Sequence, residues 1–214
     1  MNKYHDRFFR FISKIAPFSS KGQIDWLFEQ LFFLYNDRPY HNLSHVFFCL
    51  SQLDIVSGMV KNRDAIEFAL WYHDCHYNPG SKSNEQDSCN LALFSGQDLC
   101  LNEKFLKKVQ KLILSTRKHR SIKSIIRPDI DEDILHDIDY CILGQNLEVY
   151  ECYFKGVQQE LSGTEFYPRG RIHFLQEVMK KDIFRTDYFF HMYEGIARAN
   201  IIWELNLLGS RYQG

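Results

Sequence analysis

The chain has 214 residues, of which 45% are hydrophobic, 15% aromatic and 25% charged, and its formal net charge is -1. This composition is typical of a globular protein and excludes a largely disordered one, which would combine few hydrophobic residues with a high net charge. The charge also argues against sequence-independent binding of nucleic acid, which needs an excess of basic residues.

Helical spacing of apolar residues runs through most of the chain. In residues 24–35 the apolar side chains recur every three or four positions and form one stripe, which is typical of an amphipathic helix. The same spacing predicts helices at residues 44–56, 64–74, 84–94, 103–114, 132–143, 147–161, 170–179 and 188–208. No stretch alternates between apolar and polar residues in the way that predicts a strand.

Clusters of Pro, Gly, Ser and Asn interrupt the predicted helices at residues 36–42, 78–84, 118–131 and 163–171. None of these breaks is long enough to divide two independent cores, and the chain contains no internal repeat. A length of 214 residues suits one core. The sequence therefore predicts an all-α fold in which residues 1–214 form a single domain.

The six cysteines are scattered without a C-x-x-C pair, and the first residues lack the long apolar region of a signal peptide. The longest apolar run, residues 31–35, is far too short to cross a bilayer. We therefore expect a protein of the reducing cytoplasm with no membrane partner.

Among the nine histidines, the most informative is His73, which is followed directly by Asp74 at the end of a predicted helix. Near a helix end the two side chains can converge on one point, and imidazole and carboxylate both bind middle and later divalent metals. The ion also offsets the cost of removing the carboxylate from water. His45 lies in the first turns of another predicted helix, which Asn42 or Ser44 can cap.

A second carboxylate strengthens this interpretation. Asp137 and Asp139 are two residues apart on the predicted helix 132–143, so only one of them can face an inward site. Asp139 lies four residues after Leu135 and four before Leu143, on the apolar stripe. A carboxylate on an apolar face needs a partner, and a metal ion provides one.

The order His45, His73-Asp74, Asp139 resembles the H…HD…D pattern of the HD superfamily of all-helical, metal-dependent phosphohydrolases. The segments RPYHNLSHV, WYHDCHYNP, NEQDS, LILSTRKH, DIDYCILG and YPRGRIHFL…EGIARANIIWEL resemble a bacterial family of that superfamily along most of the chain. The resemblance implies that His45, His73, Asp74 and Asp139 are the metal ligands. It also implies a five-helix core at about residues 24–144, with C-terminal helices at about residues 145–213 packed on it.

The implied activity is hydrolysis of a phosphoester by water that one or two divalent ions activate, with Mn, Fe, Co, Ni, Zn or Mg as candidates. Asp74 would bridge two ions. The expected partner is a small molecule such as a nucleotide rather than a nucleic-acid polymer. An oligomer stays open, because the many aromatic residues suit either a core or a self-associating surface.

The residue that handles the proton is less well defined. Several HD enzymes have a Glu or Lys three residues after the motif aspartate, where this chain has Tyr77. The candidates for catalytic roles are Asp74, His76, Glu85 and His119. Glu85 equally suits the first turn of a helix and His119 a helix end, where the helix dipole favours their charges.

Phosphate binding requires cations beside the metal. The candidates are His41, Arg117, Arg169 and Arg171. Arg169 and Arg171 lie at a predicted helix start, where backbone N–H groups also favour an anion. In the last predicted helix, an ion pair between Glu194 and Arg198 would explain both residues without catalysis.

Two other functions are compatible with the pattern. A di-iron oxygenase of the HD type would need two further ligands between Asp74 and Asp139, which His119 and His136 could supply. The other is a non-catalytic module, metal-stabilised or metal-free, that senses a nucleotide. The intact metal ligands argue against it, and Tyr77 in place of an acid/base residue argues for it.

Overall fold

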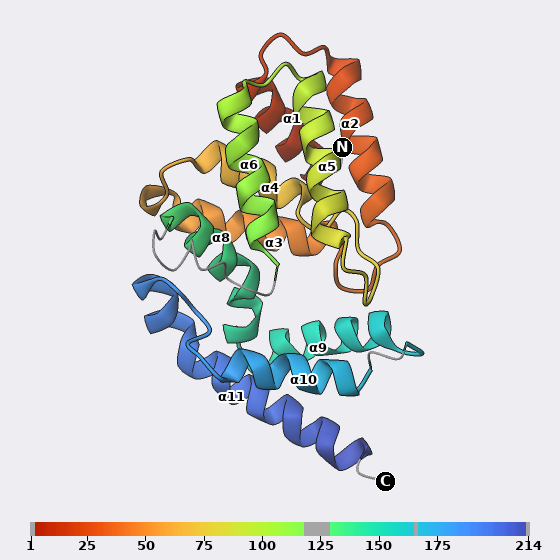
Figure 1. Ribbon diagram of the computed structural model, residues 1–214, viewed down its shortest axis with the longest axis vertical. Coiled ribbons are helices and arrows are strands. Elements are labelled where there is room, and N and C mark those ends of the chain that lie inside the picture. The colour runs from red at the N-terminus through yellow and green to blue at the C-terminus, as the bar shows by residue number, and fades with distance from the viewer. Residues whose placement is uncertain (1–2, 118–128, 165–166, 213–214) are drawn as a thin grey trace. The chain divides into compact units, whose positions relative to one another are not determined.

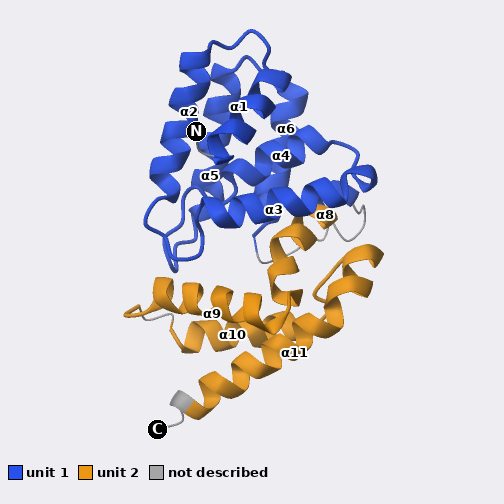
Figure 2. Cartoon of the chain, turned by 180° about the vertical axis from the view of Figure 1, so that it is seen from behind, with its two compact units in different colours: residues 1–132 blue, residues 133–214 orange. Residues whose placement is uncertain are grey.

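The computed structural model describes residues 3–117, 129–164 and 167–212, and the regular elements in these ranges are all helices (Figure 1). The predicted all-α fold is confirmed. The chain divides into two compact units, residues 1–132 and 133–214, with the border inside helix α8, Ile130–Tyr140 (Figure 2). The single domain over residues 1–214 stays a prediction. None of the described helices is long and apolar enough to span a membrane.

Unit 1 is built from helices that follow each other through short connections. They are α1 (Lys3–Ile15), α2 (Lys21–Tyr35), α3 (Leu43–Ile55), the 3-10 turn η1 (Ser57–Met59), α4 (Arg63–Tyr72), α5 (Asn84–Asp98) and α6 (Glu103–Ser115). The helix α1 is not among the predicted helices, although Phe8, Phe11 and Ile12 form its buried stripe. Its apolar residues Tyr4, Phe8, Phe11, Ile12 and Ile15 do recur at helical spacing, so the sequence carries a signal for α1 that the prediction did not use.

The helix α4 is enclosed on all sides by the rest of unit 1. Every residue from Ala65 to Tyr72 is buried, and α4 packs against α3, α5 and α6. On α1, Phe8 meets Trp71 edge to face with ring centroids 5.1 Å apart. A helix that is apolar all round is stable only inside a core, so α4 is the centre of unit 1.

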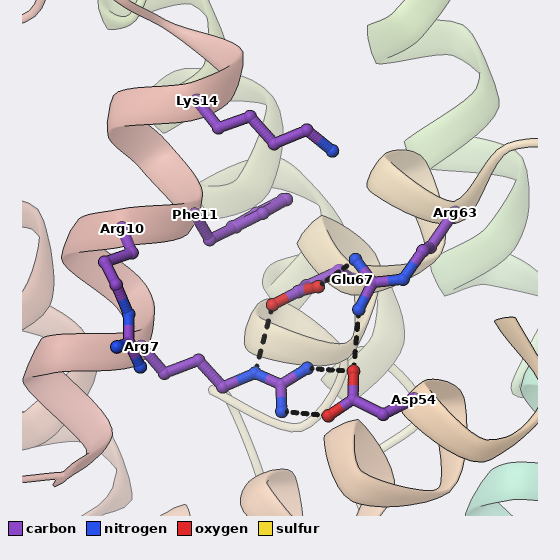
Figure 3. A pocket seen from close by; sticks show the side chains of 7 residues that line it. All are labelled: Arg7, Arg10, Phe11, Lys14, Asp54, Arg63 and Glu67. Carbon is purple, nitrogen blue, oxygen red and sulfur yellow. Dashed lines mark hydrogen bonds and ion pairs between the residues drawn. The ribbon is translucent and has the colours of Figure 1, made fainter.

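Buried Glu67 is the exception on this apolar helix, and two arginines neutralise it (Figure 3). Arg7 Nε lies 3.1 Å from Glu67 Oε1, and Arg63 Nη1 lies 2.8 Å from Oε2. Both guanidinium groups also contact Asp54 of α3 at 2.6 Å. A buried carboxylate needs such partners, so this ring of four charges connects α1, α3 and α4. The open pocket beside it is lined by Arg7, Arg10, Phe11, Lys14, Asp54, Arg63 and Glu67.

Side-chain caps set where several helices begin. The carbonyl of the Asn42 side chain accepts a hydrogen bond from Ser44 N at 2.8 Å, which satisfies a backbone donor at the start of α3. Ser20 does the same for α2 and Asn102 for α6. Of the two residues predicted to cap the helix that carries His45, Asn42 is therefore the one that does so.

Unit 2 contains the rest of α8, the 3-10 turn η2 (Cys141–Gly144), α9 (Leu147–Leu161), α10 (Arg169–Met179) and α11 (Asp187–Tyr212). The tightest approach is between η2 and α11. A Cβ atom at Gly144 would lie 2.4 Å from Cβ of Tyr193 and 2.9 Å from its carbonyl oxygen. Only glycine fits there without a shift of the backbone.

Two ion pairs stabilise the interior of unit 2. The predicted pair is confirmed, since Arg198 Nε lies 2.7 Å from Glu194 Oε1. Glu194 also accepts hydrogen bonds from the backbone of Ile183 and Phe184. The second pair joins Arg171 of α10 to Glu204 of α11, which is fully buried.

Candidate metal centre

The first candidate ligand, His45, is placed by the start of α3. Its position just after the Asn42 cap puts the imidazole in the first turn of the helix, where it is only 5% exposed. The Nδ1 atom lies 3.1 Å from the hydroxyl oxygen of Tyr40. The other ring nitrogen, Nε2, is turned toward the second histidine.

His73 and Asp74 come from the end of α4. His73 closes the helix with its backbone N–H donating to Ala69, and its side chain is buried. Its Nδ1 lies 3.0 Å from the carbonyl oxygen of Leu70. A carbonyl can only accept, so Nδ1 carries the proton and Nε2 is the atom available to a metal. Asp74 follows at the first residue beyond the helix, with its side chain 22% exposed.

The three residues bring their ligand atoms together. Nε2 of His45 lies 3.3 Å from Nε2 of His73, and Oδ2 of Asp74 lies 3.1 Å from His73 Nε2 and 3.6 Å from His45 Nε2. Ligand atoms about 2.1 Å from one ion, at octahedral or tetrahedral angles, lie roughly 3.0–3.4 Å apart. The distances of 3.1 and 3.3 Å lie in this range and that of 3.6 Å is slightly longer, so the spacing is close to that of three ligands of one ion.

The charge at this point favours a cation. Burial alone would raise the pKa of the Asp74 carboxyl, but the neighbouring imidazoles of His73 and His45 hold that pKa well below its usual range. Asp74 is therefore an anion at neutral pH. Two imidazoles and a carboxylate suit Zn, Fe, Ni, Co or Mn better than a purely oxygen-seeking ion.

Asp139, the fourth predicted ligand, is partly buried on α8 in unit 2. Its role as a ligand stays a prediction. We call His45, His73 and Asp74 of unit 1 the three-ligand cluster. Asp137, two residues before Asp139, has a different role, because it accepts hydrogen bonds from the backbone of Arg185 and Thr186, each at 2.8 Å.

Two of the residues predicted to transfer a proton, His76 and Glu85, lie in the part of the chain that the structure describes. His76 is two residues beyond Asp74, and its backbone N–H donates to the hydroxyl of Ser88 at 3.0 Å. Glu85 is in the first turn of α5, and Arg117 Nε lies 3.7 Å from its carboxylate. His119 lies outside the described residues. The catalytic roles of these residues stay predictions.

The residues predicted to bind phosphate differ in how they are engaged. His41 stacks on Tyr77, with ring centroids 4.0 Å apart, and its ring lies 5.9 Å from that of His45. Arg117 is 45% exposed beside Glu85. In unit 2, Arg169 is exposed at the start of α10, whereas Arg171 is buried against Glu204. The role of Arg171 in phosphate binding stays a prediction, and its buried ion pair with Glu204 favours a structural role in unit 2.

Two residues of the loop before α3 support the cluster and are not predicted in these roles. Tyr40 contacts His45, as described above. Arg38 donates hydrogen bonds to the carbonyl oxygens of Asp74 and Cys75, both at 2.6 Å. The only sequence signal is that both residues lie in the RPYH segment just before the ligand.

Comparison with models of known protein families finds none that matches this chain, and no curated protein compared with it is significantly similar in sequence. Membership of the HD superfamily therefore stays a prediction that rests on the motif residues.

Proposed function

We propose that the protein is a metal-dependent phosphohydrolase of the HD type, which hydrolyses a phosphoester of a small molecule such as a nucleotide. The observation that carries the proposal is the convergence of His45, His73 and Asp74, whose ligand atoms lie 3.1–3.6 Å apart. By the HD pattern, Asp139 would be the fourth ligand. The order of these residues along the chain matches the HD pattern.

Each ligand has a distinct part in this function. His45 and His73 would bind the ion through Nε2, since their Nδ1 atoms are occupied by Tyr40 and Leu70. Asp74 and Asp139 would supply the negative charge that holds a divalent cation in a partly buried site. The bound ion would lower the pKa of water to about 7 and so provide a nucleophile for phosphorus.

The surroundings offer groups for the substrate. His41 lies next to the cluster in a stack with Tyr77 and can donate to a phosphate oxygen. Glu85 and His76 are the described candidates for accepting or donating the proton of the reaction. Arg117 beside Glu85 can neutralise the phosphate.

No specific observation favours the alternatives. The di-iron oxygenase needs further ligands, and His136 is held by Asp137 with its Nδ1 3.0 Å from Oδ1. Among the described residues, there is no further group of candidate metal ligands beside the predicted set. A non-catalytic module would bind the metal and a nucleotide without turnover, so an activity assay separates it from the enzyme.

The test begins with elemental analysis of the protein purified without chelator or affinity metal. We expect one or two divalent ions per chain, lost in Asp74→Asn and kept in the control Asp87→Asn, whose carboxylate is exposed on α5. The metal found is then supplied in a screen of nitrophenyl phosphates and nucleotides. Turnover that requires Asp74 supports the enzyme, whereas metal binding without turnover of any phosphoester would refute it.

A further inference from the structure

We propose that Tyr40 is a positioning residue that makes His45 a metal ligand, by accepting the hydrogen bond of its Nδ1–H group. This inference rests on the proposed metal centre. The hydroxyl oxygen of Tyr40 lies 3.1 Å from Nδ1 of His45, on the side of the imidazole opposite His73 and Asp74. Tyr40 would act on the metal only through His45.

An imidazole binds a metal only through a nitrogen without a proton. In neutral histidine one nitrogen carries the proton, and the group bonded to that nitrogen decides which one is left for the ion. For His73 the partner is the carbonyl of Leu70, which can only accept. For His45 the partner is a phenol, which can accept or donate. The Tyr40 hydroxyl therefore has to take the acceptor role when an ion binds at Nε2.

Tyr40 and Cys49 both lie near Nδ1 of His45, and Tyr40 is the stronger partner of the two. The sulfur of Cys49 lies 3.8 Å from both ring nitrogens. At this distance a thiol is a weak partner that does not distinguish one nitrogen from the other. Removing the Tyr40 hydroxyl would therefore take a hydrogen bond away from the buried Nδ1–H group, which disfavours the tautomer that binds metal.

The position of Tyr40 is itself fixed by its loop. Its ring packs against His45 with centroids 5.0 Å apart, and its carbonyl accepts a hydrogen bond from Asn42 N at 2.7 Å. Asn42 Nδ2 donates to the carbonyl of Arg38 at 2.8 Å, and Arg38 in turn holds the backbone of Asp74. One loop thus orients both His45 and Asp74.

The experiment compares Tyr40→Phe with Tyr4→Phe in the full chain. The hydroxyl of Tyr4 lies 3.0 Å from Oγ of Ser44, the residue before His45. The control therefore loses a tyrosine hydroxyl that lies near His45 and contacts Ser44. Affinity for Co²⁺ and Mn²⁺ is measured by calorimetry on metal-free protein whose circular dichroism matches that of the wild type. We expect Tyr40→Phe to weaken binding by roughly 10–100-fold and Tyr4→Phe to stay within about twofold. In Tyr40→Gln the amide oxygen can accept from Nδ1–H, so part of the affinity should return.

A second measurement tests the tautomer of His45 that the inference requires, even if Tyr40→Phe fails to fold. Nitrogen chemical shifts of ¹⁵N-histidine in the Zn²⁺-loaded wild type should show His45 with a proton on Nδ1 and the ion on Nε2. An ion on Nδ1, or equal affinities of Tyr40→Phe and Tyr4→Phe, would overturn the inference. Failure of the proposed function looks different, because the wild type would bind metal in this manner and still hydrolyse no phosphoester.

Discussion

The buried ion pair of unit 2 yields a prediction about stability. Arg171 is 5% exposed and Glu204 is fully buried, with Nε and Nη2 of the arginine 2.7 and 2.9 Å from the carboxylate oxygens. The hydroxyl of Tyr150 donates to the same carboxylate at 2.5 Å. In Arg171→Met the carboxylate would stay buried with Tyr150 alone. Breaking one partner of such a pair costs about 3–5 kcal/mol of the free energy of unfolding.

The double variant Arg171→Met/Glu204→Met separates this cost from the loss of packing. It removes both charges and leaves the Tyr150 hydroxyl without its acceptor, at a cost of about 1–3 kcal/mol. The double variant should therefore be more stable than Arg171→Met. Urea unfolding followed by circular dichroism measures both, and with a slope near 2 kcal/mol per molar the midpoint of Arg171→Met falls by roughly 1.5–2.5 M.

Two results would refute this reasoning. If Arg171→Met lost less than about 1 kcal/mol, the carboxylate would not depend on the arginine. If the double variant were less stable than the single one, the pair would contribute net stability rather than mutual neutralisation. A role of Arg171 in binding phosphate predicts a third pattern, in which KM for the substrate rises while the urea midpoint stays unchanged.

Burial acts to raise the pKa of Asp129. Hydrogen bonds from Lys108 and a neighbouring lysine outweigh this effect and lower the pKa to about 2. The stability that this carboxylate contributes is thus present above about pH 4 and lost as the pH falls toward 2, so Asp129→Asn should flatten that part of an acid titration of the thermal midpoint. Arg38→Gln should weaken metal binding by roughly tenfold in calorimetry, since it releases the backbone of one ligand. Equal affinity would contradict this. Gly144→Ala should cost about 1–3 kcal/mol in urea unfolding through its clash with α11, whereas Gly22→Ala, with open space around it, should not destabilise.

Much of the fold follows from patterns that are local in the chain. Apolar spacing predicts the helices from α2 onward that the structure describes, and the caps at Ser20, Asn42 and Asn102 explain where three of them begin. The helix α1 is missed although its apolar residues recur at helical spacing. Its place in unit 1 depends on Arg7 and Phe8, whose partners lie far away in the sequence.

The candidate site shows the same limit. The resemblance to the HD pattern selects His45, His73, Asp74 and Asp139 as ligands, and the structure brings the ligand atoms of the first three together. The hydrogen bonds that orient them cannot be selected in this way. Nothing in the sequence distinguishes Tyr40 and Arg38 from other loop residues. Only the structure shows that the Tyr40 hydroxyl contacts His45 and that the Arg38 guanidinium binds the backbone of Asp74. Arg171 gives the opposite lesson, because its buried partner lies 33 residues later and no motif indicates it.

The enclosed helix α4 has a consequence for how the chain is made. Its residues from Ala65 to Tyr72 leave the ribosome before α5 and α6, the helices that cover it, because α6 ends only at Ser115. During that interval an apolar helix is without part of its cover, and such a surface is prone to aggregation. Slow synthesis of residues 73–115, or truncation within them, should therefore lower the yield of folded protein more than changes in unit 2 do.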